Sequence, residues 1–75
     1  MIDLTVMQNV DRIVNEVSAI YGIDPKNIYA KGRWEPLASA RKEAMRRCRK
    51  ELKLSLPVLG EVFHRHHTTI LSACR

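Results

Sequence analysis

Side chains able to bind an anion are concentrated in one third of this 75-residue chain. Residues 31–53 hold nine lysines and arginines against three glutamates, a net charge of +6, whereas the remainder of the chain carries −1. A basic stretch of this density attracts a polyanion and raises the rate of encounter. A solvated helix face can look the same, and charge alone does not separate DNA, RNA and an anionic membrane.

The segment at residues 65–69, Arg-His-His-Thr-Thr, has side chains suited to the edges of base pairs. Arginine can donate two hydrogen bonds to guanine, and a threonine methyl group can pack on the methyl group of thymine. On residue type alone, the simpler interpretation of the two threonines is that they cap a helix. His64, His66 and His67 could bind a metal, but the sequence lacks zinc-finger spacing and a paired cysteine cluster. We therefore expect no metal and no cofactor.

Neither catalysis nor membrane insertion is supported by the sequence. It has no carboxylate pair on one face, no nucleophile–base arrangement and no glycine-rich phosphate loop, so we expect no enzymatic activity. No apolar run approaches the roughly 20 residues of a membrane span. Cys48 and Cys74 lack CxxC spacing and fall on apolar helical phases, which predicts two reduced, buried thiols.

Hydrophobic spacing predicts helices and no strands, in a single all-α domain over residues 1–75. A first helix is expected over roughly residues 5–21. Thr5 and Gln8 fit a capping box at its start, and Gly22 fits a cap at its end. Its inward stripe is expected to consist of Val6, Met7, Val10, Ile13, Val14, Val17, Ile20 and Tyr21.

The middle of the chain predicts a short turn, a basic loop and a long helix. Asp24-Pro25 is a helix-start signal that would bring Ile28 and Tyr29 into the core. A basic loop follows at residues 31–33, with Trp34 as a core or loop anchor. A helix over about 36–53 would bury Leu37, Ala40, Ala44, Cys48 and Leu52, and place Arg41, Lys42, Arg46, Arg49 and Lys50 on other faces.

The last third predicts a helix-turn-helix over about residues 55–75. Ser55 and Pro57 fit the start of a helix of little more than one turn. Residues 64–66 form a polar connection, and a final helix begins at His67 or Thr68. Its inward residues are expected to be Ile70, Leu71 and Cys74. A short helix, a tight turn and a helix with a polar outer face are typical of this motif.

Three strings in this frame carry a family resemblance. They are Ser-Leu-Pro-x-x-Gly-x-x-Phe at 55–63, Arg-x-His-Thr-Thr-Ile-Leu-x-Ala-Cys-Arg at 65–75, and Arg-x-x-Ala-Met at 41–45. On these residues the chain resembles the C-terminal DNA-binding domain, domain IV, of the bacterial replication initiator DnaA, a Trp-repressor-like helical fold. The resemblance covers about residues 10–75.

The resemblance implies a role for particular residues. Arg33 would enter the minor groove, Arg41 would help hold the DNA, and Arg49 would contact phosphate. The start of the short helix would offer backbone N–H groups to phosphate. Base reading would fall to Arg65, His67, Thr68 and Thr69. The full set of expected DNA-binding residues is Lys31, Arg33, Arg41, Arg49, Ser55, Leu56, Pro57, Arg65, His66, His67, Thr68 and Thr69.

The chain departs from the family pattern in the turn. One residue, His64, replaces two glycines, and His66 replaces an aspartate that could accept a hydrogen bond from cytosine, so the target sequence could differ. These 75 residues also include neither the family's further helix nor an ATPase domain.

We therefore expect a bacterial or phage protein, located in the cytoplasm at the nucleoid, that binds double-stranded DNA at DnaA-box-related sites and regulates transcription or replication. The alternative is a protein-interaction module that kept the fold and lost specific readout.

Overall fold

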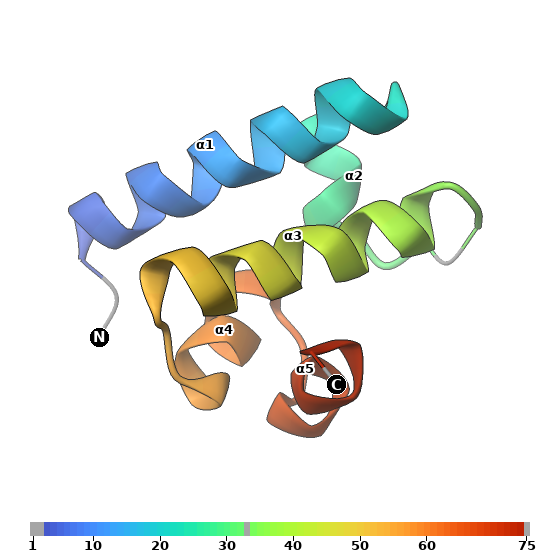
Figure 1. Cartoon of the computed structure of the whole chain (residues 1–75). Helices are drawn as coiled ribbons and strands as arrows, with labels where there is room; N and C mark the ends of the chain where they lie inside the picture. The colour runs from blue at the N-terminus through green and yellow to red at the C-terminus, as the bar shows by residue number, and fades with distance from the viewer. Residues whose placement is uncertain (1–2, 33, 75) are drawn as a thin grey trace.

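The computed structural model of the chain describes residues 3–32 and 34–74, and every regular element in them is an α-helix (Figure 1). This confirms the predicted all-α class. The helices are α1 (Leu4–Tyr21), α2 (Pro25–Tyr29), α3 (Leu37–Leu52), α4 (Leu56–Phe63) and α5 (His67–Cys74). None of these helices is long and apolar enough to cross a membrane.

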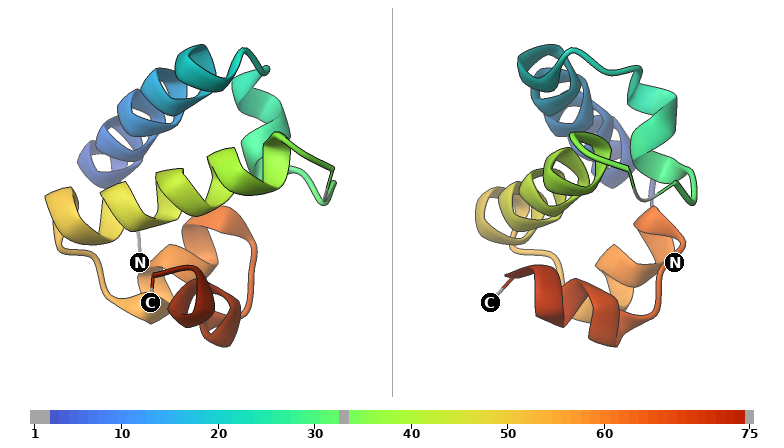
Figure 2. Two further views of the ribbon diagram at one scale, coloured as in Figure 1. Left: turned by 45° about the vertical axis from the view of Figure 1, so that its right-hand side comes forward. Right: turned by 90° about the vertical axis from the view of Figure 1, so that its right-hand side faces the viewer.

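Helix α3 is the centre of the fold and contacts the four other helices. Helices α1 and α2 pack on one side of it, and α4 and α5 pack on the other (Figures 1 and 2). The buried side chains of all five helices form one core, which includes Ile13, Ile28, Met45 and Phe63. The rings of Tyr29 and Phe63 stack with centroids 5.8 Å apart, so α2 also touches α4.

The predicted end of α1 is confirmed and its predicted capping box is wrong. Gly22 adopts a left-handed backbone with φ of 68°, and its N–H donates to the Ser18 carbonyl. At the other end the cap is Asp3, whose carboxylate accepts from the Val6 N–H at 2.9 Å. Aspartate caps at least as well as threonine and its charge suits the positive end of a helix, so the helix begins one residue before Thr5.

The predicted inward stripe of α1 is confirmed in the middle of the helix and is wrong at its C-terminal end. Val10, Val14 and Val17 are buried, but Ile20 is 75 % exposed. The last turn buries Ser18, which is 1 % exposed, on the other edge of the stripe. The buried stripe is only as wide as the face of α1 that meets α3 and α2. Apolar residues at the edges of this stripe can therefore be either buried or exposed.

Helix α3 has nearly the predicted bounds. Its inward face buries Leu37, Ala40, Ala44 and Cys48, while Leu52 is only half-buried. Burial raises the pKa of the Cys48 thiol to about 12, so this side chain behaves as a small apolar residue, as expected. Cys74 is half-buried, so the prediction of a buried thiol is wrong there.

Helices α4 and α5 form the predicted helix-turn-helix. Ser55 caps α4 by accepting from the Val58 N–H at 3.3 Å, as predicted. Helix α4 is longer than expected, at eight residues, because its apolar face continues through Val62 and Phe63. In α5 the buried residues are Ile70 and Ala73, and Cys74 packs against the core as expected, whereas Leu71, expected inward, is 41 % exposed.

The turn between the two helices is closed by a close approach at Gly60. The Arg65 N–H donates to the Gly60 carbonyl at 2.8 Å, and His64 takes a left-handed backbone with φ of 56°. A Cβ atom at residue 60 would lie 2.6 Å from the Arg65 carbonyl oxygen, a backbone atom that cannot step aside. Gly60 therefore permits the turn between α4 and α5 to pack closely on α4.

Replacing Gly60 by alanine should destabilise the domain by about 1–3 kcal/mol, because the added carbon crowds the turn. Helix propensity alone would stabilise the variant by about 0.5–1 kcal/mol. Urea unfolding followed by circular dichroism decides the sign. Gly22→Asn is the control: its added Cβ would have no neighbour within 4 Å, so its cost, about 1 kcal/mol, comes only from the left-handed backbone, which asparagine tolerates better than most residues. A Gly60→Ala variant more stable than wild type would contradict this role of Gly60.

Candidate nucleic-acid interface

The first turn of α5 presents the predicted base-reading segment to solvent. His67, Thr68 and Thr69 are all exposed, and they begin α5, which packs beside α4 and against α3 (Figure 2). The inward side of α5 is taken by Ile70 and Ala73, so the exposed face is free of any packing role. The structure therefore brings these three predicted residues together on one surface.

His66 supplies the acceptor at the start of α5. Its ring nitrogen Nδ1 accepts from the Thr68 N–H at 3.3 Å and lies 2.8 Å from the Thr68 hydroxyl oxygen. A neutral imidazole can accept in this way, so it takes over the capping function that short acidic side chains perform at helix starts. The His66 ring also lies against His67, with centroids 4.3 Å apart. His66 thereby fixes the backbone and the hydroxyl of Thr68.

Arg65 is directed toward the protein backbone. Its Nη1 donates to the Phe63 carbonyl at 3.0 Å and to the His64 carbonyl at 3.3 Å. Its Nη2 donates to the Ala30 carbonyl at 2.5 Å. The side chain thus ties the turn of the helix-turn-helix to the end of α2. The family resemblance implied a place for it among the base readers.

The prediction that Arg41 lies on an outer face of α3 is wrong. The residue is only 7 % exposed, and its guanidinium donates to four backbone carbonyls. Nε donates to Ile28 at 2.8 Å and Nη1 to Gly32 at 2.7 Å. Nη2 donates to Asn27 at 3.0 Å and to Ala30 at 2.6 Å. These carbonyls belong to α2 and the loop after it, which no helical periodicity in α3 could reveal.

The basic loop begins at the carbonyls that Arg41 holds. Lys31 is exposed, as a DNA-contacting lysine requires, and Arg33 lies outside the described residues. Trp34 is 52 % exposed, so of its two expected roles, core residue or loop anchor, the first is wrong. Its backbone carbonyl accepts from the Ala38 N–H at 3.0 Å, which joins the loop to the start of α3.

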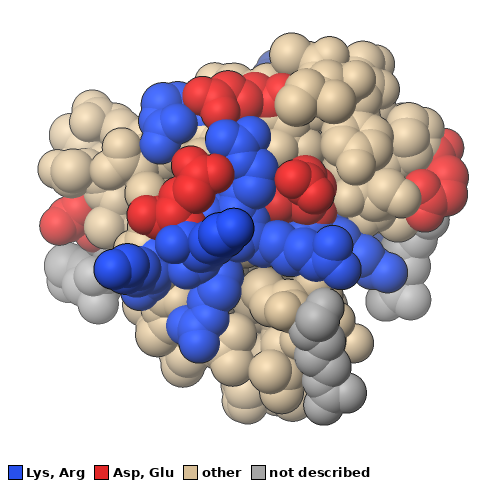
Figure 3. Space-filling view, in the orientation of Figure 1, with Lys and Arg blue, Asp and Glu red and all other residues tan. Residues whose placement is uncertain are grey.

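The outer side of α3 carries a band of cations. Lysine and arginine side chains cross the face of the molecule over α3 in Figure 3, with acidic side chains grouped on the side toward α1. The exposed cations of α3 are Lys42, Arg46, Arg49 and Lys50. Arg49 also donates to the Leu54 carbonyl at 2.6 Å, and Arg46 donates to the Ala73 carbonyl at 2.9 Å. Arg46 therefore links α3 to α5.

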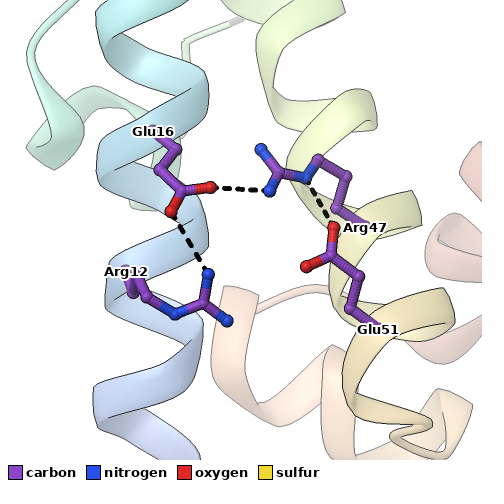
Figure 4. Close-up of polar contacts among 4 residues, drawn as sticks. All are labelled: Arg12, Glu16, Arg47 and Glu51. Atoms are coloured by element: carbon purple, nitrogen blue, oxygen red, sulfur yellow. Dashed lines mark hydrogen bonds and ion pairs between the residues drawn. The ribbon is translucent and has the colours of Figure 1, made fainter.

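Arg47 belongs to an ion-pair network between α1 and α3 (Figure 4). It lies 2.6 Å from Glu16 and 2.8 Å from Glu51, and Arg12 lies 3.2 Å from Glu16. Arg47, followed by Arg12, lowers the pKa of Glu16, while Glu51, followed by Glu16, raises the pKa of Arg47. The two carboxylates therefore offset the charge of Arg47, which contributes little to attraction of a polyanion.

A groove of about 450 Å³ separates α3 from α5. Lys42 and Arg41 line it from α3, and Thr69 and Ser72 line it from α5, with Arg65 at the turn. Ammonium, guanidinium and hydroxyl groups donate hydrogen bonds that phosphate oxygens can accept. Lys42 of α3 and Thr69 of α5 thus line the same groove.

The start of α4 completes the set of predicted residues. Ser55 and Pro57 are exposed, and Leu56 is half-buried. The Ser55 hydroxyl is used as the cap of its own helix, and a helix N-terminus favours a nearby phosphate through its dipole.

Among the described residues, the histidines form no group with cysteines or carboxylates that could hold a metal ion.

A capped short helix, a tight turn and a second helix with an exposed polar face define a helix-turn-helix domain, of the class that binds DNA. The chain belongs to the family described as the bacterial DnaA protein helix-turn-helix, which matches residues 10–75.

Among its relatives is the chromosomal replication initiator protein DnaA 1 of Chlamydia muridarum, 38 % identical over 63 residues, or 84 % of this chain and 14 % of the relative. The chromosomal replication initiator protein DnaA of Clavibacter sepedonicus is 37 % identical over 62 residues, or 81 % of this chain and 13 % of the relative. The chain thus spans only about one seventh of the length of these curated relatives. No solved structure matches it.

Replacing Arg41 by methionine should unfold the domain or cost at least about 3 kcal/mol, because buried carbonyls of α2 would lose a charged donor. Lys42→Met is the matched control on the next, exposed position of α3, and it should change stability by no more than about 0.5 kcal/mol. Thermal and urea unfolding by circular dichroism measure both. Equal stability of the two variants would contradict a structural role for Arg41.

Proposed function

We propose that this chain binds double-stranded DNA in a sequence-specific manner, with α5 in the major groove and the basic loop in the adjacent minor groove. The observation that carries the proposal is the exposed His67-Thr68-Thr69 segment at the start of α5, on the second helix of a helix-turn-helix. Its target is a site related to the DnaA box, an A·T-rich asymmetric element. Membership in the DnaA helix-turn-helix family supports that choice.

Base reading in this proposal rests on groups that point outward from α5. The Thr68 hydroxyl lies 2.8 Å from His66 Nδ1, and engaging it leaves the Thr68 methyl group for contact with a thymine methyl. His67 and Thr69 flank it on the same turn and offer a ring nitrogen and a hydroxyl. A capped helix start gives these side chains a fixed backbone, which direct readout needs.

Affinity in this proposal comes from the basic band of α3 and from the N-terminus of α4. Lys42 and Arg49 would contact phosphates on one DNA strand. The N-terminus of α4 would bind a phosphate on the opposite side of the groove. Arg33, at the end of the Lys31-Gly32-Arg33 string, would enter the minor groove, where A·T-rich DNA concentrates negative potential.

The biological role we propose is regulation at the nucleoid. A domain that binds DnaA-box-related sites can occupy a promoter or compete for an initiator's sites. The relatives are named chromosomal replication initiator proteins, but they share only this domain with the present chain. We therefore propose that these residues bind DNA and that this binding controls transcription or replication.

Replacing Thr68 by alanine should weaken binding to the preferred site by about 1–3 kcal/mol and leave binding to scrambled DNA unchanged. Fluorescence anisotropy with labelled duplexes measures both affinities. Thr5→Ala is the matched control, since Thr5 is exposed on α1, on the far side of α3. An equal loss on both duplexes would show that Thr68 contacts phosphate and does not read a base.

Replacing Arg49 by glutamine should weaken binding to every duplex alike and reduce the slope of log affinity against log salt by about 1. The slope comes from titrations at several salt concentrations. Arg12→Gln, which removes an arginine of α1 paired with Glu16, serves as the control and should leave the slope unchanged. An unchanged slope for Arg49→Gln would remove this residue from the interface.

A further inference from the structure

Two DNA-facing elements of the proposed interface are joined at one backbone oxygen. The carbonyl of Ala30, at the end of α2, accepts from Arg41 Nη2 at 2.6 Å and from Arg65 Nη2 at 2.5 Å. Arg41 comes from the central helix, and Arg65 comes from the turn of the helix-turn-helix. The basic loop starts at the next residue, Lys31.

The two arginines hold different neighbours against this point. Arg41 also binds the Gly32 carbonyl at 2.7 Å, so it fixes the first residues of the loop to α3. Arg65 also binds the Phe63 carbonyl at 3.0 Å, so it fixes the end of α4 to the same place. Charge-assisted hydrogen bonds of this kind are shorter and stronger than neutral ones and impose a defined geometry.

The hydrogen bonds add direction to a contact that is otherwise apolar. Where α2 meets α4, the rings of Tyr29 and Phe63 stack with centroids 5.8 Å apart. Packing of this type stabilises the approach of the two elements, but it tolerates sliding. The Arg65 guanidinium sets the separation, because its two terminal nitrogens reach one carbonyl of the loop's start and two carbonyls of the turn.

We infer that Arg65 is a positioning residue that fixes the distance between the basic loop and the recognition helix α5. This inference rests on the proposed function, in which the loop and α5 occupy adjacent grooves. If the distance between the loop and α5 is fixed, the protein binds well only to DNA in which the minor-groove and major-groove segments have the matching spacing. To donate to a guanine instead, Arg65 would have to release carbonyls that its terminal nitrogens bind in the folded domain.

Spacing discrimination tests this inference. Three labelled duplexes are compared by anisotropy: the site that wild type prefers, the same site with one base pair inserted between the minor-groove and major-groove segments, and the same site with one base pair of the major-groove segment exchanged. Wild type should bind the inserted and the exchanged duplexes each about tenfold or more weakly than the parent site. Wild-type affinities that are equal on the parent site and on scrambled DNA would defeat the proposed function itself.

Arg65→Met should bind the inserted duplex within about threefold of the parent site while keeping the wild-type penalty for the exchanged base pair. Arg65→Lys keeps a donor and should give an intermediate spacing penalty. Arg49→Met is the matched control, since loss of a phosphate contact should weaken all three duplexes equally. An Arg65→Met variant that keeps the spacing penalty and loses preference at one base pair would overturn the inference and make Arg65 a base reader.

A second measurement is independent of DNA and guards against misfolding. Amide hydrogen exchange should speed up by about tenfold or more at residues 30–32 and 64–67 of Arg65→Met, with no change at Val10–Val17 in the core. If Arg65→Met is unfolded at the assay temperature, Arg65→Lys decides by the same two readouts. Wild-type exchange rates at both segments in a folded variant would contradict a positioning role.

Discussion

The buried guanidinium of Arg41 is the interaction on which the proposed interface depends. Helix α2 has five residues, too few for a stable helix by its own hydrogen bonds. Arg41 compensates by donating to the carbonyls of Asn27, Ile28 and Ala30 in and after that helix. Each hydrogen bond to a charged group contributes on the order of 1.5–3 kcal/mol, which offsets the cost of burying the arginine. The basic loop therefore starts from a fixed point on α3.

The positive charge of the chain divides into a structural and an exposed part. Arg41 and Arg65 bind carbonyls, and Arg47 pairs with carboxylates of α1 and α3. The exposed cations of α3 are Lys42, Arg46, Arg49 and Lys50. Two of them, Arg46 and Arg49, also donate to a backbone carbonyl. The net charge of +6 over residues 31–53 thus overstates the number of cations available to a polyanion, although it locates them on the correct helix.

Local signals predicted most of the fold, because helix ends are decided by a few neighbouring residues. Gly22, Asp24 and Ser55 cap helices as their types indicate. Asp3 was missed because Asp3 and Thr5 are both good caps two residues apart. Ile20 and Leu71 were misplaced because they lie at the edges of apolar stripes, where only the neighbouring helix decides burial.

The candidate site was less predictable because its arginines act across the fold. Arg41 and Arg65 meet at Ala30, 11 and 35 residues away in sequence, and no helical period encodes such a contact. His66 was noted as a departure that removes an anionic acceptor. The structure adds that its neutral nitrogen still accepts from the Thr68 N–H, so the start of α5 keeps a cap.

Selection of bound sequences from random duplex DNA at physiological salt tests the central claim most directly. The account predicts enrichment of one asymmetric, A·T-rich site related to the DnaA box, bound at least about a thousandfold more tightly than random DNA. Recovery of no common sequence, with equal affinity for all duplexes, would contradict sequence-specific binding by His67, Thr68 and Thr69.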